Sequence, residues 1–451
     1  MRASWTGCRN QCRKKGSVRA GHFPRELLGR LVSYSLRRFK TMEGIFRSMF
    51  EARLEEAIED LALPEGSVKY PIRESLSLVW NPFSGSSEPS GFAVCDGSSG
   101  SVRYSGGLTV WLLRAACVLS ESDPLAEVWV EVGHRLEGRR YCLRALELEL
   151  LTRAVEVLPR GAIAVADGTL YPVLPLSAEV LVRRAKYVEV FLKALVKFLK
   201  TCLRREVTPV GFSKDSDVSY LRVRLALDYL KNRGIDIGRE RSLKRIVKTL
   251  KALEDDSIVR LVMEELKVPS SDQEEVEFVT SDPGFTTPLV LAPHTLYLTE
   301  EIRAGTESWW DSRLRARWSR FEELKSIVEL LDELYGIRPL YVTYWRPHHG
   351  LGVYRVDSLA TFYQGNWGDL NIDEISENGV THARSVASAL NFLSTPPHTL
   401  RPLLDVDELV RLGKGTFMET YEPLIRDALR RKGFSVRLRR RVIRDLYLGR
   451  F

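Results

Sequence analysis

Two aspartates of this 451-residue chain stand at the ends of short apolar runs, and each is followed by glycine. Asp96 ends the run at 92–95, and Asp167 ends the run at 162–166. A buried strand holds its end rigidly, and a glycine lets the backbone turn away so that the carboxylate points into a cleft. Two such carboxylates suit a hard divalent cation, which prefers oxygen ligands. Two ordinary Asp-Gly turns are the alternative interpretation, because this dipeptide is common in loops.

A third carboxylate comes from a leucine-rich helix that we expect at 141–158. Residues three and four apart share a helix face, which places Glu147 on the apolar face and Glu149 off it. A buried carboxylate needs a cation, a proton or a nearby arginine such as Arg144, so a salt bridge explains Glu147 as well as a metal does. Asp, Glu and Asp on strand, helix and strand are nevertheless the ligand types that two-metal phosphodiester hydrolysis uses.

Strands and helices alternate around these residues, and their order predicts a mixed α/β domain. Beside the strand at 92–95 we expect strands at 108–119 and 126–132, and then the helix at 141–158 and the strand at 162–166. The other expected elements are a helix at 178–204, a strand at 207–212, a charged helical insertion at about 221–270, strand-like segments at 287–298 and 339–356 on either side of a helix at 319–335, and helices at 386–393 and from about 405.

The formal net charge of +8 is concentrated at the two ends of the chain. Residues 1–41 hold eleven Lys or Arg and one acid, residues 426–451 hold ten and two, and the body between them therefore carries −10. The basic tail at 426–451 alternates apolar and basic residues, which suggests a strand with a cationic face. The basic leader at 1–41 lacks the apolar core of a secretory signal. An amphipathic helix at 42–70 begins with Met42, so a translation start there is an alternative.

Several classes of protein are excluded by composition and pattern. No window approaches the roughly 20 apolar residues that a membrane span requires. The six cysteines are scattered and do not form a disulfide framework. The glycine-lysine stretch at 413–416 lacks the spacing of a phosphate-binding loop, so a motor driven by ATP must come from a partner.

Four short motifs lie at 92–98, 164–170, 210–216 and from 344–346 to 355–357, within roughly residues 71–412. Their residues and their order resemble the NurA family of DNA end-processing nucleases. The resemblance implies an RNase H-like fold in a nuclease domain at 71–425. It also implies a Mn²⁺- or Mg²⁺-dependent 5′-to-3′ exonuclease and single-strand endonuclease that acts on DNA in end resection and double-strand break repair. A homodimer, a HerA-type hexameric helicase as partner and a cytoplasmic location complete the expectation.

The resemblance also suggests which residues form the site. Asp96, Asp167 and either Glu147 or Glu149 match the metal-binding carboxylates of the family. The family usually completes the site with a His or Asp on a short helix after a Tyr-Pro corner, and here the corner reads Thr395-Pro396-Pro397. For that last position we expect Asp407, with Asp405 and His398 as alternatives. The motif at 355–357 ends in Asp357, where the family more commonly has Glu. This difference keeps the negative charge and shortens the side chain.

Three basic residues are predicted to contact nucleic acid. Lys214 follows a strand and could hold a phosphate as a point charge, although a solvated turn lysine explains it too. Arg346 and Arg355 belong to the family-like motifs. A segment of Trp and Arg at 309–318 has the composition of a groove that binds single-stranded nucleic acid, but packing on a helix surface explains it better. Two other functions remain open, a DNA-binding subunit with a decayed site and an RNase H-like phosphodiesterase that acts on RNA.

Overall fold

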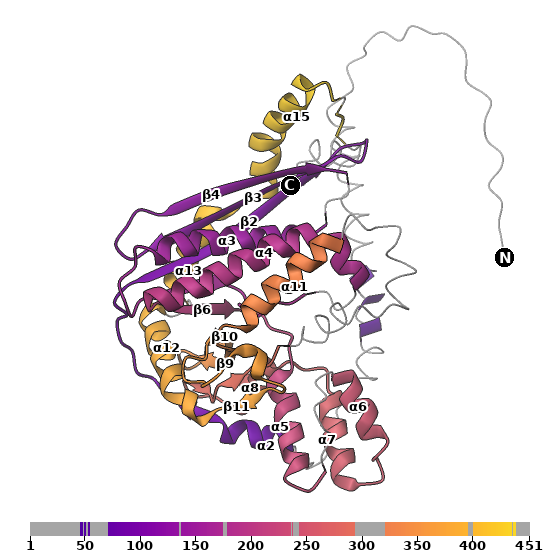
Figure 1. The fold of residues 1–451 in the computed structure, drawn as a ribbon. Helices are drawn as coiled ribbons and strands as arrows, with labels where there is room; N and C mark the ends of the chain where they lie inside the picture. Colours follow the sequence, from indigo (N-terminus) through magenta and orange to yellow (C-terminus); the bar gives the residue numbers. More distant parts are fainter. Residues whose placement is uncertain are drawn as a thin grey trace, which may run out of the picture. The chain divides into compact units, whose positions relative to one another are not determined.

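The computed structural model describes residues 46–47, 49–50, 53–54, 71–134, 137–174, 178–235, 237, 243–293, 321–395, 400–434 and 436–438 (Figure 1). The chain divides into two compact units, Met1–Val68 and Lys69–Phe451. In the first unit the described residues are helical, within the helix that the sequence predicts at 42–70. The predicted leader at 1–41, His398 and the segment at 309–318 lie outside the described residues.

The second unit is built on one mixed sheet. Its strands are β1 (Trp80–Pro82), β2 (Phe92–Arg103), β3 (Thr109–Leu119), β4 (Leu125–Gly133), β5 (Ile163–Asp167), β6 (Thr208–Ser213), β7 (Gly284–Thr286), β8 (Leu289–Val290), β9 (Leu340–Arg346), β10 (Tyr354–Leu359) and β11 (Glu374–Ile375). Nine of these strands lie side by side in the order β1-β7-β9-β10-β6-β5-β2-β3-β4. The other two, β8 and β11, pair with each other, and β8 also pairs with β9. The mixed α/β class is confirmed, while its RNase H-like detail stays a prediction.

The middle of the sheet is parallel and buried. β2 pairs in parallel with β5, and β5 pairs in parallel with β6, whereas β3, β4 and β10 join antiparallel. Residues 163–166 of β5 are buried without interruption, as expected for a strand that lies inside a sheet covered on both faces. This explains why the two apolar runs of the sequence carry no polar residue before their aspartates.

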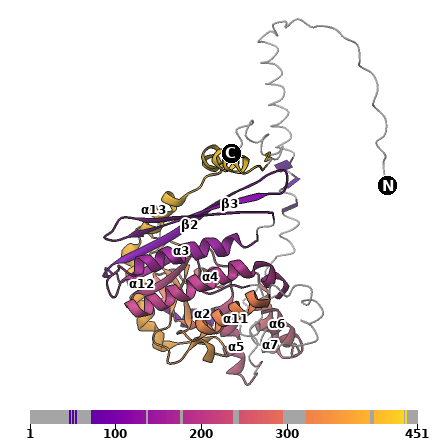
Figure 2. The same ribbon diagram turned by 45° about the horizontal axis from the view of Figure 1, so that its top comes forward.

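Helices cover both faces of this region of the sheet. The described helices of this unit are α2 (Pro71–Leu78), α3 (Arg139–Val155), α4 (Ala178–Arg205), α5 (Tyr220–Lys231), α6 (Leu243–Lys251), α7 (Ser257–Lys267), α8 (Asp272–Val279), α11 (Phe321–Tyr335), α12 (Val380–Leu393), α13 (Arg401–Val410), α14 (Lys414–Thr416) and α15 (Glu422–Arg431). On one face α3 packs on β2 and β3, α4 packs on α3, and α11 packs on α4 (Figures 1 and 2). None of the described helices is long and apolar enough to cross a membrane.

The opposite face of β2 and β3 is covered by α13 and the segment after it. A Cβ atom on Gly97 would meet Leu143 of α3, whereas one on Gly100 would meet Leu412 and Phe417 beyond α13. Positions 97 and 100 therefore point to opposite faces of β2, as the alternation of a strand requires. The strand that carries Asp96 is thus held between α3 and α13.

Two further segments bear on the sequence predictions. Helices α5 to α7 occupy the region of about 221–270 in which the sequence predicts a helical insertion, and α8 follows it. The guanidinium of Arg222 on α5 donates to the carbonyl oxygen of Glu265 on α7 at 2.8 Å. In the predicted basic tail, α15 continues to Arg431, so its first residues are helical. The predicted strand is limited, among the described residues, to a single bridge between Leu438 and Tyr104.

Candidate active site

The two aspartates lie at the same height on neighbouring strands. Cys95 pairs with Ala166 in the parallel register of β2 and β5, so Asp96 and Asp167, the next residue on each strand, are brought level. Asp96 is buried, with 8% of its surface exposed. This burial, and next the negative charge of Asp167, raises the pKa of Asp96 to about 6. The parallel pairing therefore creates a pair of carboxylates that repel each other.

The glycines after the two aspartates have different roles. β5 ends at Asp167, and Gly168 takes a φ of +98°, which is the sharp turn that the sequence predicts. The predicted turn after Asp96 is wrong, because β2 continues through Gly97 to Arg103. A Cβ atom on Gly97 would lie 2.6 Å from Oε1 of Glu147. Gly97 thus makes room for a third carboxylate against the strand.

Glu147 rather than Glu149 joins the aspartates. The side chain of Glu147 is buried, with 3% exposed, whereas Glu149 is exposed on the outer side of α3. Burial raises the pKa of Glu147 to about 7, Arg144 opposes this rise, and the charges of Asp96 and Asp167 add to it. The glutamate on the apolar face of the helix is thus the one that lies against β2, and its role as metal ligand stays a prediction.

Two positively charged side chains, Arg144 and Lys214, pair with these carboxylates. Nη1 of Arg144 is 2.6 Å from Oε2 of Glu147 and also donates to the carbonyl oxygen of Asp167, and Nη2 donates to the carbonyl oxygen of Thr169 at 2.9 Å. Nζ of Lys214 is 3.2 Å from Oδ2 of Asp167. The backbone of Lys214 is itself held by α8, because Gln273 donates to its carbonyl oxygen at 2.8 Å. Lys214, predicted to hold a phosphate, therefore stands at the edge of the carboxylate cluster.

Asp407 approaches the cluster from α13. Its negative charge is one of the influences that raise the pKa of Asp96, and 40% of its side chain is exposed. Oδ2 of Asp407 is 2.9 Å from Nη2 of Arg411. The end of α13 is fixed to the sheet, since Nε of Arg114 donates to the carbonyl oxygen of Val410 at 2.7 Å. Asp405 is paired with Arg401 and is not among the groups that raise this pKa.

The two predicted nucleic-acid arginines are buried. Arg346, with 5% exposed, donates to the carbonyl oxygens of Leu351, Glu277 and Thr280 at 2.8, 3.2 and 3.0 Å. Arg355, with 3% exposed, pairs with Asp357 through Nε and Oδ1 at 2.8 Å. Both guanidinium groups thus bind groups inside the protein. Their predicted contact with nucleic acid gains no support from these positions.

The donor set of the cluster fits a hard divalent cation. Asp96, Glu147 and Asp167 offer only oxygen atoms, and burial and then the neighbouring carboxylates raise the pKa of Asp96 and Glu147 against the opposing charges of Lys214 and Arg144. Within the described ranges, no three His, Cys, Asp or Glu side chains converge closely enough to hold a metal ion as they stand. Arg144 pairs with Glu147, and Lys214 pairs with Asp167.

The model of one protein family, described as the NurA domain, matches residues 91–412. This chain belongs to the NurA family. The matched range contains Asp96, Glu147, Asp167, Lys214 and Asp407. The first 90 residues and the basic tail lie outside it.

Solved NurA structures are similar to this NurA chain at low sequence identity. The NurA nuclease from Sulfolobus solfataricus is 14% identical with a TM-score of 0.48, and the match covers 86% of this chain and 98% of that one. A NurA structure with manganese is 13% identical with a TM-score of 0.38, covering 85% and 98%. A NurA structure bound to dAMP and manganese is 14% identical with a TM-score of 0.36, covering 86% and 96%. No curated protein sequence matches the chain.

Proposed function

We propose that this NurA chain is a metal-dependent nuclease that hydrolyses the phosphodiester bonds of DNA with Mn²⁺ or Mg²⁺ as cofactor. The observation that carries the proposal is that Asp96 and Asp167 lie level on β2 and β5, and that their charges lie close enough to Glu147 of α3 to raise its pKa. Membership of the NurA family supports it, and the names of similar structures mention manganese and dAMP.

Each residue has a part in this proposal. Asp96, Glu147 and Asp167 hold the cation, which when bound polarises the phosphate and lowers the pKa of an attacking water. Lys214, whose side chain is 43% exposed, leaves Asp167 and donates to a phosphate oxygen of the DNA strand. Asp407 closes the site from α13, where its exposure gives it access to water and substrate. Arg144 keeps Glu147 and the turn after Asp167 in place.

The finer activity rests on the family resemblance. We propose 5′-to-3′ exonuclease and single-strand endonuclease activity in DNA end resection, in a cytoplasmic homodimer that works with a HerA-type helicase. The described residues of the N-terminal helix leave Phe46, Phe50 and Leu54 exposed, with 57%, 63% and 42% of their surfaces accessible. Such an apolar helix face suits contact with a second copy or with the helicase. Co-purification of a chain that lacks residues 42–70 with a helicase would test this assignment.

Digestion of end-labelled DNA tests the proposed reaction. Wild-type protein should cleave DNA with Mn²⁺ or Mg²⁺ and stop when a chelator is added, whereas Asp96→Asn and Asp167→Asn should fold and not cleave. Matched DNA and RNA strands digested side by side distinguish the two substrates. Full activity of both variants would refute the metal assignment. Binding of DNA without cleavage at any metal concentration would instead support a decayed, DNA-binding subunit.

A further inference from the structure

The turn that follows Asp167 is held from a distant strand. Oδ2 of Asp357 on β10 accepts hydrogen bonds from the backbone N–H of Leu170, at 3.0 Å, and from the hydroxyl of Thr169. β10 is two strands away from β5, because β6 lies between them. A side chain of ordinary length does not usually reach across a whole strand of a sheet, so this contact requires an explanation.

Gly211 of β6 makes the contact possible. It is paired with Ala166 on one side and with Asp357 on the other, so it lies directly between the turn and Asp357. A Cβ atom at this position would lie 2.8 Å from the backbone nitrogen of Leu170 and 2.9 Å from the carbonyl oxygen of Gly168. The turn therefore folds back over bare backbone of β6, where the N–H of Gly168 donates to the carbonyl oxygen of Phe212 at 2.6 Å.

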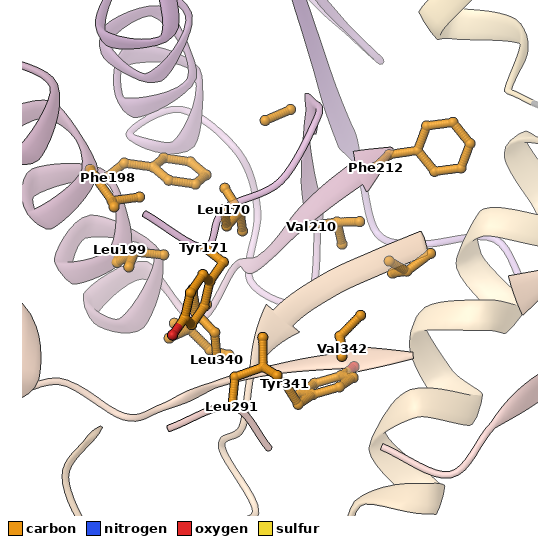
Figure 3. Packing of buried hydrophobic residues seen from close by; sticks show 14 of the residues in the cluster. Leu170, Tyr171, Phe198, Leu199, Val210, Phe212, Leu291, Leu340, Tyr341 and Val342 are labelled. Atoms are coloured by element: carbon orange, nitrogen blue, oxygen red, sulfur yellow. The ribbon is translucent and has the colours of Figure 1, made fainter. Parts of the chain in front are cut away.

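The charge of Asp357 is held by Arg355. Both side chains are buried, with 0% and 3% exposed, and Nη2 of Arg355 donates to the hydroxyl oxygen of Thr169 at 3.2 Å. Two buried charges thus converge on one threonine. Beyond it, Leu170 and Tyr171 point into the buried cluster beside Leu199 and Val210 (Figure 3), and the hydroxyl of Tyr171 donates to the carbonyl oxygen of Ala292 at 2.6 Å.

We propose that Asp357 and Arg355 are positioning residues for the metal site, and that Gly211 is the gap through which they act. The inference rests on the proposed function. The turn that they fix begins at Asp167, and Arg144 binds the carbonyl oxygens of Asp167 and Thr169 while it binds Glu147. Moving the turn therefore moves one proposed ligand directly and a second through Arg144. The role of Arg355 is to position this turn, and contact with nucleic acid is not needed to explain it.

Two variants test this role in different ways. Asp357→Asn keeps the shape and removes the charge, and Gly211→Ala leaves every charge in place but pushes the turn with a methyl group. Changes to groups that orient metal ligands typically weaken metal binding about 10- to 100-fold. We expect a loss of that size for Mn²⁺ alone, measured by titration calorimetry on the intact chain. Cleavage of DNA by Gly211→Ala should recover when the Mn²⁺ concentration is raised.

Each variant has a control of the same kind elsewhere in the fold. Glu265→Gln alters a buried carboxylate that also accepts two backbone N–H groups, those of Ile72 and Arg73 at 3.0 Å each. Gly284→Ala adds a methyl group to β7, where its Cβ would lie 2.5 Å from the carbonyl oxygen of Asn81. Both controls should lower the thermal stability of the protein and bind Mn²⁺ as the wild type does.

The outcomes are distinct. Unchanged Mn²⁺ binding in Gly211→Ala and Asp357→Asn, with a wild type that binds Mn²⁺ and cleaves DNA, overturns the positioning role and leaves the proposed function intact. Equal weakening in the controls also overturns it, since the effect would then reflect general destabilisation. A wild type that neither binds Mn²⁺ nor cleaves DNA refutes the proposed function and this inference together. If Asp357→Asn does not fold, Gly211→Ala decides the question.

Discussion

Substituting Gly97 by alanine should separate stability from activity. The added Cβ would lie 2.6 Å from Oε1 of Glu147 and 2.7 Å from Cδ1 of Leu143, about 1 Å short of ordinary contact. Both atoms are at the far ends of flexible side chains, so the side chains move rather than the backbone of β2. The stability cost is therefore at the low end for overpacking, about 1 kcal/mol.

The effect on activity should be much larger. A displacement of about 1 Å in a catalytic group costs on the order of 100-fold in rate. We therefore expect Gly97→Ala to unfold in urea nearly as the wild type does and to digest DNA on the order of 100-fold more slowly at a fixed Mn²⁺ concentration. Gly106→Ala is the control, because a Cβ there would meet nothing within 4 Å.

A second substitution tests the proposed cause. Glu147→Asp shortens the side chain that the methyl group displaces, so the double variant with Gly97→Ala should lose less activity than the two separate effects combined. A Gly97→Ala protein within twofold of the wild-type rate would refute the reasoning. So would a loss of activity that is explained by unfolding alone.

Three further predictions follow from contacts around the site. Arg144→Met removes hydrogen bonds to Glu147 and to two carbonyl groups, so the free energy of unfolding measured in urea should fall by about 2 kcal/mol or more; an unchanged value would show that the contacts are weak. Gln273→Ala removes the hydrogen bond to the carbonyl oxygen of Lys214, so a fluorescence titration should show severalfold weaker binding of single-stranded DNA. Binding of Mn²⁺ should be unchanged, and its loss would contradict this prediction. Burial raises the thiol pKa of Cys95 and Cys202 well above its usual range. These cysteines should therefore react with a disulfide reagent only after the protein unfolds. Rapid labelling of the native protein would contradict their burial.

The placement of Asp96, Asp167 and Glu147 can be predicted from local patterns in the sequence. Uninterrupted apolar runs before Asp96 and Asp167 indicate buried parallel strands, and such strands bring their ends to one edge of the sheet. The face of α3 that carries Glu147 follows from helical periodicity. These patterns depend only on neighbours in the chain, which is why they could be interpreted without the structure.

The surroundings of Gly97, Asp357 and Arg355 depend instead on contacts between strands that are far apart in the sequence. Gly97 resembles a turn residue in the sequence, yet it lies within β2, where it pairs with Ala115 of β3. The contact between Asp357 and Thr169 follows from the order β10-β6-β5 and from the absence of a side chain on Gly211. The spacing of residues along the sequence does not reveal the order in which strands lie in a sheet. For the same reason the sequence predicts a nucleic-acid contact at Arg355, whereas the structure buries this residue beside Asp357.

Comparison of two glutamates on α3 tests the central claim most directly. Glu147 and Glu149 are two residues apart, and only Glu147 lies with the aspartates. Rates of Mn²⁺-dependent digestion of end-labelled DNA should fall by about 100-fold in Glu147→Gln and stay at the wild-type value in Glu149→Gln. A wild-type rate in Glu147→Gln, or an equal loss in Glu149→Gln, would contradict the account of the site.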